Sequence, residues 1–142
     1  KILDIGCAKG FLVKDLLNQG IDAFGLDISK YALVNCEPEV VGRLQIGSAE
    51  VLPFPDNSFD AVIAINSIHN LPRNLCKVAL QEMERLASGK CFVQVDSYQT
   101  EKQKELFLSW VLTAEHHDYP DDWIKLFKEA GYTGDYYWTI LG

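Results

Sequence analysis

Several features that mark particular protein classes are scarce or missing in this sequence of 142 residues. It contains no run of about eighteen apolar residues and no signal peptide, so it indicates neither a membrane span nor secretion. Its four cysteines show no C-x-x-C spacing, which disfavours both a disulfide framework and a zinc site. We therefore expect a protein of the reducing cytoplasm.

Basic side chains are also few. The sequence has 13 Lys and Arg against 20 Asp and Glu, which gives a formal net charge of −7. Nucleic-acid backbones and anionic membranes attract clustered Lys and Arg, so we expect neither as a partner and predict a small-molecule substrate instead. With 48% hydrophobic residues the chain can bury one core, which predicts a single domain over 1–142. The sequence indicates no particular oligomeric state.

Apolar runs alternate along the chain with segments of helical periodicity. Strands are predicted over 2–6, 23–27, 44–46, 59–65, 91–95 and 136–141, and helices over 11–19, 30–37, 75–86, 101–112 and 123–130. Ser29 is the predicted N-cap of the second helix, and Asp121 or Asp122 that of the last. This alternation predicts an α/β fold with a doubly wound, mostly parallel sheet and helices on both faces.

The most informative segment is the turn Asp4-Ile5-Gly6-Cys7-Ala8-Lys9-Gly10 after the first strand. Glycines in a turn between a strand and a helix let the backbone approach a ligand closely, and Asp27 at the tip of the next strand can hold ribose hydroxyls. Asp4 would repel a pyrophosphate but suits a ligand that carries a cation. A nucleotide cofactor and a plain tight turn both remain open from this segment alone.

Two segments resemble one known family. The turn is similar to the D/E-x-G-x-G-x-G turn of class I S-adenosylmethionine-dependent methyltransferases, with Ala8 in place of the middle glycine. Residues 47–60, Gly-Ser-Ala-Glu-Val-Leu-Pro-Phe-Pro-Asp-Asn-Ser-Phe-Asp, resemble the G-D-A-x-x-L-P-F-x-x-x-S-F-D segment of the same enzymes, most closely those of type 11. The resemblance covers residues 1 to about 89. It implies a Rossmann-like fold and methyl transfer from S-adenosyl-L-methionine to a small-molecule acceptor that the sequence does not name.

The resemblance also implies cofactor-binding residues. They lie in the glycine turn, at the tip of the second strand, in the 47–60 segment and after the fourth strand: Asp4, Gly6, Cys7, Ala8, Gly10, Asp27, Ile28, Ser48, Ala49, Glu50 and Asn66. Asp4 either holds the methionine end or caps the turn. Ser48 stands where the family usually has an acid that accepts from the adenine amine, so Glu50 either takes that role or is a solvated loop acid.

Catalytic and acceptor-binding candidates follow the fourth strand and the fourth helix. His69 could act as a general base if the acceptor starts protonated, or it could be a polar residue bonded to backbone at a helix start. His116, His117 and Tyr119 form a second polar cluster that could close over the acceptor. Adjacent residues rarely face one ion, so we expect no metal site at His-His-Asp.

The sequence departs from the family pattern at both ends. We expect no helix ahead of the first strand, and only one of the two strands that usually end the fold, of which the last is antiparallel. These departures keep two other functions open. One is a binding or interaction domain that lacks catalysis, and the other is a nicotinamide-dependent oxidoreductase on a similar sheet.

Overall fold

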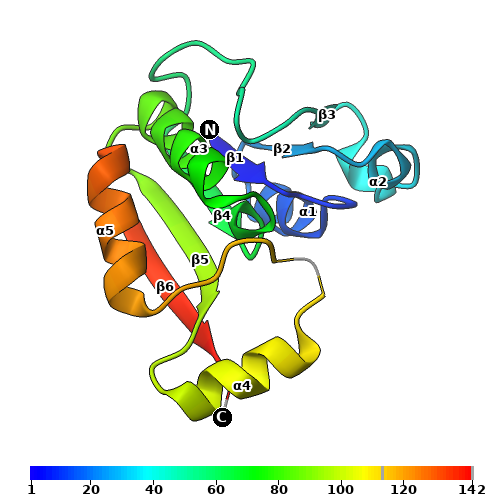
Figure 1. The fold of residues 1–142 in the computed structure, drawn as a ribbon. Coiled ribbons are helices and arrows are strands. Elements are labelled where there is room, and N and C mark those ends of the chain that lie inside the picture. The colour runs from blue at the N-terminus through cyan, green and yellow to red at the C-terminus, as the bar shows by residue number, and fades with distance from the viewer. Residues whose placement is uncertain (113, 142) are drawn as a thin grey trace.

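The computed structural model describes residues 1–112 and 114–141, which form a six-stranded sheet flanked by helices (Figure 1). The sheet order is β3-β2-β1-β4-β5-β6, and each neighbouring pair is parallel. The strands are β1 (Ile2–Ile5), β2 (Ala23–Asp27), β3 (Leu44–Ile46), β4 (Ala61–Ile65), β5 (Cys91–Ser97) and β6 (Asp135–Ile140). The helices are α1 (Phe11–Asn18), α2 (Lys30–Val34), α3 (Arg73–Leu86), α4 (Glu101–Trp110) and α5 (Pro120–Ala130), with short 3₁₀ turns η1 (Pro38–Val40) and η2 (Ile68–Asn70).

The predicted doubly wound α/β fold is confirmed, and its sheet is parallel throughout the described residues. β6 pairs with β5 in parallel over six residues, from Asp135 beside Phe92 to Ile140 beside Ser97. The sequence had suggested a mostly parallel sheet, and the described residues contain no antiparallel strand. No helix within those residues has the length and apolar character needed to cross a bilayer.

Helix caps explain where two helices begin. Ser29 caps α2 as predicted, because its side chain accepts from the backbone N–H of Ala32. The predicted cap of α5 at Asp121 or Asp122 is wrong. Tyr119 is the N-cap residue there, without a side-chain cap bond, and both acids lie in the first turn. Pro120 determines this start, since proline lacks an N–H and its fixed φ suits the first helical position.

The core has one layer on each face of the sheet. The larger cluster joins α3 and α5 to the strands and contains the fully buried Leu3, Val62, Leu80 and Trp123. A smaller cluster lies under α1 around Val13. Figure 1 shows α3 and α5 together on one side of the sheet and α1 on the other. Because helices cover both faces of the sheet, the central strands are buried on both sides, and their sequences are nearly continuous apolar runs.

Strand order reverses at β1, and this reversal positions the site. From β1 the chain passes to β2 and β3 on one side, and it then returns to β4 on the other. The helices that follow these two strands, α1 and α3, lie on opposite faces of the sheet, so the chain parts beyond the carboxyl ends of β1 and β4. In open α/β sheets this switch point is where ligands bind.

Candidate functional site

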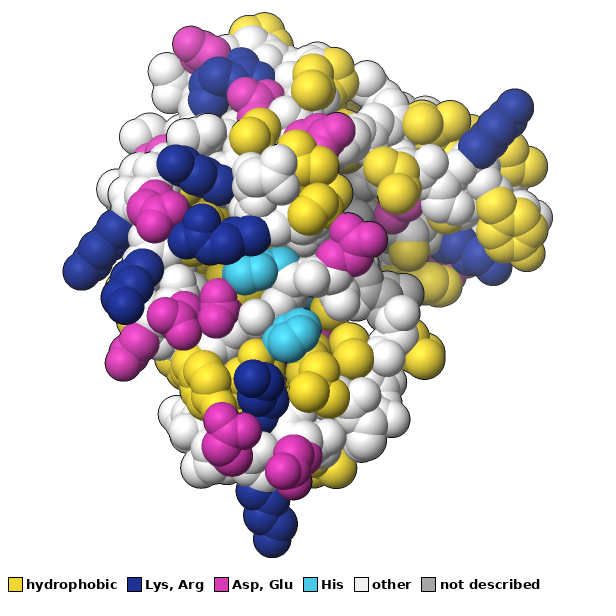
Figure 2. Space-filling model, viewed as in Figure 1, with side chains coloured by type: hydrophobic (Ala, Val, Ile, Leu, Met, Phe, Trp, Pro, Cys, Tyr) yellow, Lys and Arg dark blue, Asp and Glu magenta, His cyan; other side chains and the backbone are white. Residues whose placement is uncertain are grey.

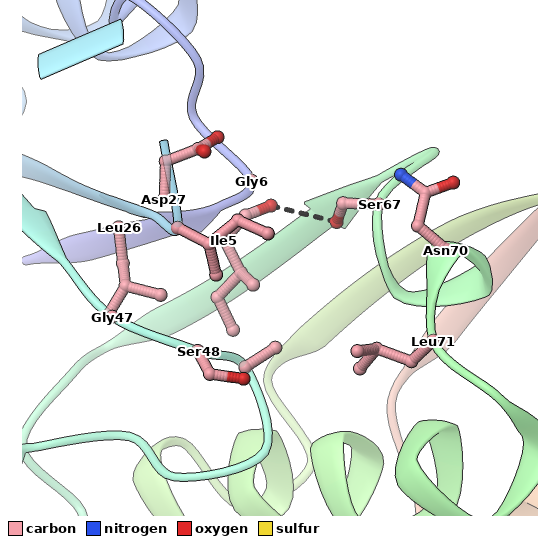
Figure 3. Close-up of a pocket in the computed structure, with 11 residues that line it drawn as sticks. Ile5, Gly6, Leu26, Asp27, Gly47, Ser48, Ser67, Asn70 and Leu71 are labelled. Carbon is pink, nitrogen blue, oxygen red and sulfur yellow. Dashed lines mark hydrogen bonds between the residues drawn. The ribbon is translucent and has the colours of Figure 1, made fainter. Parts of the chain in front are cut away.

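A cavity of about 160 Å³ lies at the switch point (Figure 3). It brings together five residues that the sequence singled out: Gly6, Asp27, Ile28, Ser48 and Ala49. The rest of its lining is Ile5, Leu26, Gly47, Ser67, Asn70 and Leu71. The carboxyl ends of β1 and β2 thus form one side of the cavity, and the segment after β4 forms the other.

Gly6 allows the end of β1 to approach the segment after β4. Its φ is +79°, and a Cβ built there would overlap the Cβ of Ser67. The Ser67 hydroxyl donates to the Ile5 carbonyl at 3.0 Å, the bond drawn dashed in Figure 3. A side chain at residue 6 would push these two segments apart, so glycine is required by contact as well as by backbone conformation.

The other turn residues lie outside the cavity lining. Gly10, at φ +87°, faces the packing under α1, where a Cβ would lie 2.7 Å from Val40 Cγ2. Cys7 is buried in the same cluster. Ala8 has a left-handed φ of +50° and is exposed. The second predicted glycine therefore serves helix packing, and the turn presents Gly6 and backbone groups to the cavity.

Asp27 ends β2 at the rim of the cavity. One carboxylate oxygen accepts from the backbone N–H of Ala8 at 2.9 Å, and the other accepts from that of Ser29 at 2.8 Å. These two bonds fix the carboxylate in place, and each oxygen keeps a lone pair for a further donor. Beside it, Ile28 is 76% exposed. A fixed acceptor next to an exposed apolar side chain suits a ribose hydroxyl and the face of a base.

Asp4 adds a second acid close to this site. It is 6% exposed, and its pKa is raised to about 7, first by burial and then by the charge of Asp27. Two neighbouring carboxyl groups disfavour an additional negative charge and favour a cation. This arrangement fits a nucleoside that carries a positive charge and fits a pyrophosphate poorly.

Residues 47–49, which follow β3, form a third wall of the cavity. Gly47 donates its N–H to the Asp27 carbonyl at 3.0 Å, and the Ser48 hydroxyl accepts weakly from Glu50 N–H at 3.4 Å. Ser48 and Ala49 line the cavity, whereas Glu50 does not. The Glu50 Oε2 atom is buried and has no hydrogen-bond partner among the described residues.

His69 lies in η2 behind the cavity wall and does not line it. It is 4% exposed, and its Nδ1 accepts from the backbone N–H of Asp96 at 3.3 Å. Its Nε2 lies 3.9 Å from Asp96 Oδ2. Burial lowers the pKa of His69, partly opposed by Asp96. This is the backbone-bonded arrangement that the sequence left open beside the role of base. Asn66, at φ +50°, is exposed and also lies outside the lining.

The predicted acceptor cluster fastens the connector after α4 to the body of the protein. The backbone N–H of His116 donates to the His69 carbonyl at 3.0 Å, and its ring packs edge-on against Trp123. His117 Nδ1 and Tyr98 Oη are 2.6 Å apart. The Tyr119 hydroxyl donates to Glu101 at 2.7 Å. None of the three predicted residues lines the cavity.

Sequence reasoning missed the wall made by Ser67, Asn70 and Leu71. The available signal was their place directly after β4, at the edge where ligands bind in this fold. His69 was a candidate because histidine can titrate near neutral pH, whereas Ser67 and Asn70 have no side-chain group that titrates there.

The cavity residues fit S-adenosylmethionine better than they fit a metal ion. Asp27 offers acceptors for ribose hydroxyls, and Ile28, Ala49 and Leu71 offer apolar contacts for a base. Asp4 and Asp27 together suit a cationic sulfonium. Within residues 1–112 and 114–141, no group of three or more His, Cys, Asp and Glu side chains could hold a metal.

Comparison with known sequences gives the following similarities. Residues 3–93 match the methyltransferase domain family. The human mitochondrial arginine-hydroxylase NDUFAF5 is 37% identical over 78 residues, which cover 51% of this chain and 23% of the hydroxylase. The demethylmenaquinone methyltransferase of Symbiobacterium thermophilum is 28% identical, and the match covers 99% of this chain and 72% of that enzyme. The chain thus spans less than a quarter of the arginine hydroxylases it matches.

Solved structures share the fold. A putative methyltransferase in complex with the Trm112 activator of Haloferax volcanii superposes with a TM-score of 0.74 at 21% identity, covering 92% of this chain and 60% of that one. A putative methyltransferase from Bacillus halodurans gives 0.73 at 19% identity, covering 92% and 61%. At this level of identity the superpositions establish the shared Rossmann-like architecture.

Proposed function

Because the chain belongs to the methyltransferase domain family and has its class I, Rossmann-like fold, we propose that it binds S-adenosylmethionine at the switch point and methylates a small molecule. The observation that carries this proposal is the Asp27 carboxylate, fixed by two backbone N–H groups on the cavity wall. We also propose that residues 1–142 form a single domain. The four free thiols support a cytoplasmic location.

The proposed roles follow from position in the cavity. Asp27 accepts from the ribose hydroxyls, Ile28 and Ala49 contact the adenine, and the Gly6 turn holds the methionine end. Asp4 does not line the cavity and acts on the methionine end through its charge, which also interacts with Asp27. Charge-assisted hydrogen bonds to a carboxylate contribute roughly 1.5–3 kcal/mol each, so Asp27 is the largest single contributor. When bound, S-adenosylmethionine supplies an electrophilic methyl group on a sulfonium.

The protein's own part in such a transfer is mainly orientation. Holding two reactants in line and excluding water can supply roughly 7–11 kcal/mol. The cavity lining contains no His, Lys or Tyr, and the buried His69 is bonded to the β5 backbone. This favours an acceptor whose nucleophilic atom needs no base from the cavity wall. The same observation supports the second candidate function, a binding domain without catalysis.

Calorimetry tests the binding step. We expect heat on titration with S-adenosylmethionine or S-adenosylhomocysteine at high micromolar concentration, and a complete lack of binding would refute the proposal. A parallel titration with NADH, followed by fluorescence, is expected to give no signal, and tight NADH binding would favour an oxidoreductase.

An acceptor screen then separates the two candidate functions. Two relatives are named as a demethylmenaquinone methyltransferase and a ubiquinone biosynthesis O-methyltransferase, so demethylmenaquinone and precursors of ubiquinone are reasonable first acceptors. Turnover that is lost in His69→Ala without loss of cofactor binding would assign His69 the role of base. Binding without turnover on any acceptor would favour the non-catalytic domain.

A further inference from the structure

Arg85, in the last turn of α3, reaches into the loop that follows the cavity wall. Its guanidinium donates to the carbonyls of Leu52 and Phe54, at 3.0 and 2.8 Å, and to the Asp56 carboxylate at 2.8 Å. The Arg85 guanidinium thus binds two backbone carbonyls and one side chain of the loop. Planar guanidinium groups suit this task because their five donors have a rigid arrangement.

Glu82, one turn earlier on α3, completes the connection. Its two carboxylate oxygens accept from Arg85 Nε and Nη2, each at 2.9 Å, and Oε2 also accepts from the Leu52 N–H at 2.9 Å. Both backbone polar groups of Leu52 are therefore bound by this pair. The hydrogen bond from Arg85 lowers the pKa of Glu82, so the pair is ionised at neutral pH.

The loop between these anchors and the sheet contains the adenine-side wall. At one end, Gly47 N–H is bonded to the carbonyl of Asp27. At the other end Leu52, 3% exposed, is held by α3. Ser48 and Ala49, which line the cavity, lie on the short bridge between the two anchors. A displacement of Leu52 therefore moves the wall, because only two residues lie between Leu52 and Ala49.

We propose that Arg85 and Glu82 are positioning residues that set the Ser48–Ala49 wall for recognition of the adenine ring, although neither lines the cavity. The proposal rests on the proposed function, since it assigns the wall to the adenosine part of the cofactor. Arg73 provides a matched control at the other end of α3. Its guanidinium contacts both oxygens of Glu129 at 3.2 Å, which joins α3 to α5 and leaves the loop untouched.

Hydrogen exchange of the ligand-free protein tests the positioning directly. We expect Arg85→Met to speed exchange over residues 48–56, Arg85→Lys to have a smaller effect, and Arg73→Met to leave this segment unchanged. Exchange over 48–56 that is the same in Arg85→Met and in the wild type would overturn the proposal. If Arg85→Met fails to fold, Glu82→Gln serves instead, because it can still accept from Leu52 but loses its charge.

Ligand preference supplies a readout that a general loss of stability does not change. We expect Arg85→Met to weaken the binding of S-adenosylhomocysteine roughly tenfold. We also expect it to reduce the ratio of the affinities for S-adenosylhomocysteine and S-inosylhomocysteine, two ligands that differ only in the base. Equal weakening of both ligands, with the preference kept, would contradict positioning of the adenine wall. If the wild-type protein binds neither ligand, the proposed function fails, and the exchange measurement still decides whether the loop is held by Arg85.

Discussion

At the scale of single residues, the contact between Gly6 and Ser67 determines how closely β1 and the segment after β4 converge on the cavity. The hydroxyl of Ser67 is bonded to the Ile5 carbonyl, and this leaves no space for a Cβ at residue 6. Shape at the switch point thus depends on two small residues. A larger residue at either position would separate the strands that carry the site.

Replacing Gly6 with Ala should destabilise the protein more than the same change at Gly20. Both glycines have φ +79°, but a Cβ at Gly20 meets nothing within 4 Å. We expect Gly20→Ala to cost about 1–2 kcal/mol, the cost of left-handed backbone, and Gly6→Ala about 3 kcal/mol or more, because the clash with Ser67 adds to it. Urea denaturation measures both, and equal costs would show that the clash relaxes freely.

Removing the Asp27 carboxylate should weaken cofactor binding much more than removing the Asp22 carboxylate at the other end of the strand does. We expect Asp27→Ala to reduce affinity for S-adenosylhomocysteine roughly tenfold or more, because the charged acceptors for the ribose hydroxyls are lost. Asp22→Ala is the matched control, since Asp22 precedes the other end of β2 and pairs with Arg43. Calorimetry on both variants checks this, and unchanged affinity in Asp27→Ala would show that another group binds the ribose.

At the scale of elements, the connector after α4 is fastened in part by a buried histidine, His116. His116 is 9% exposed, and its pKa is lowered to about 4, first by burial and then by the charges of Arg73, His117 and His69. Asp118 Oδ2 lies 3.3 Å from its Nε2, but the buried Nε2 atom makes no hydrogen bond within the described residues. The imidazole of His116 is therefore neutral in the folded protein at neutral pH, and protonation of the imidazole opposes its packing in this buried position.

Acid should loosen this connector. The unfolded chain binds a proton at His116 near pH 6.5 and the folded protein only near pH 4, so stability falls as the pH drops between these values. In His116→Gln we expect the free energy of unfolding to fall by roughly 1–3 kcal/mol less over this pH range than it does in the wild type. Urea denaturation at about pH 7.5 and pH 4.5 measures it. The same pH dependence in wild type and variant would mean that His116 is protonated in the folded protein.

Elements were more predictable from sequence than the walls of the site. Buried strands such as Ala61–Ile65 can be recognised in the sequence because both of their faces need apolar residues. Asp27 was predictable because its place at a strand tip follows from chain order. Chain order also placed the segment after β4 at the site. Which of its side chains face the cavity was not predictable, because that depends on the contact between Gly6 and Ser67, which are far apart in the sequence. The start of α5 was misjudged because Pro120, followed by two acids, resembles an ordinary capped start.

At the scale of the whole molecule, the acidic balance of the chain matters for ligand charge. The net charge of −7 and the Asp27 carboxylate favour cations at the site, and Asp4, whose pKa is raised to about 7, adds negative charge as the pH rises through neutrality. Figure 2 shows basic side chains most numerous on the α3 and α5 side of this face, and others at its α2 end among hydrophobic ones. The field at the switch point should then be negative over distances of about one Debye length.

This field predicts different salt dependence for two otherwise similar ligands. S-adenosylmethionine carries one more positive charge than S-adenosylhomocysteine, so screening should weaken the first and leave the second nearly unchanged. Between about 0.02 and 0.5 M salt the Debye length shrinks severalfold, and we expect the affinity ratio of the two ligands to shift severalfold toward S-adenosylhomocysteine. Calorimetry across this range measures the ratio. A constant ratio would mean that the sulfonium lies where neither the net charge nor the Asp4–Asp27 pair acts on it, and the methionine end would then have to be placed elsewhere than at the Gly6 turn.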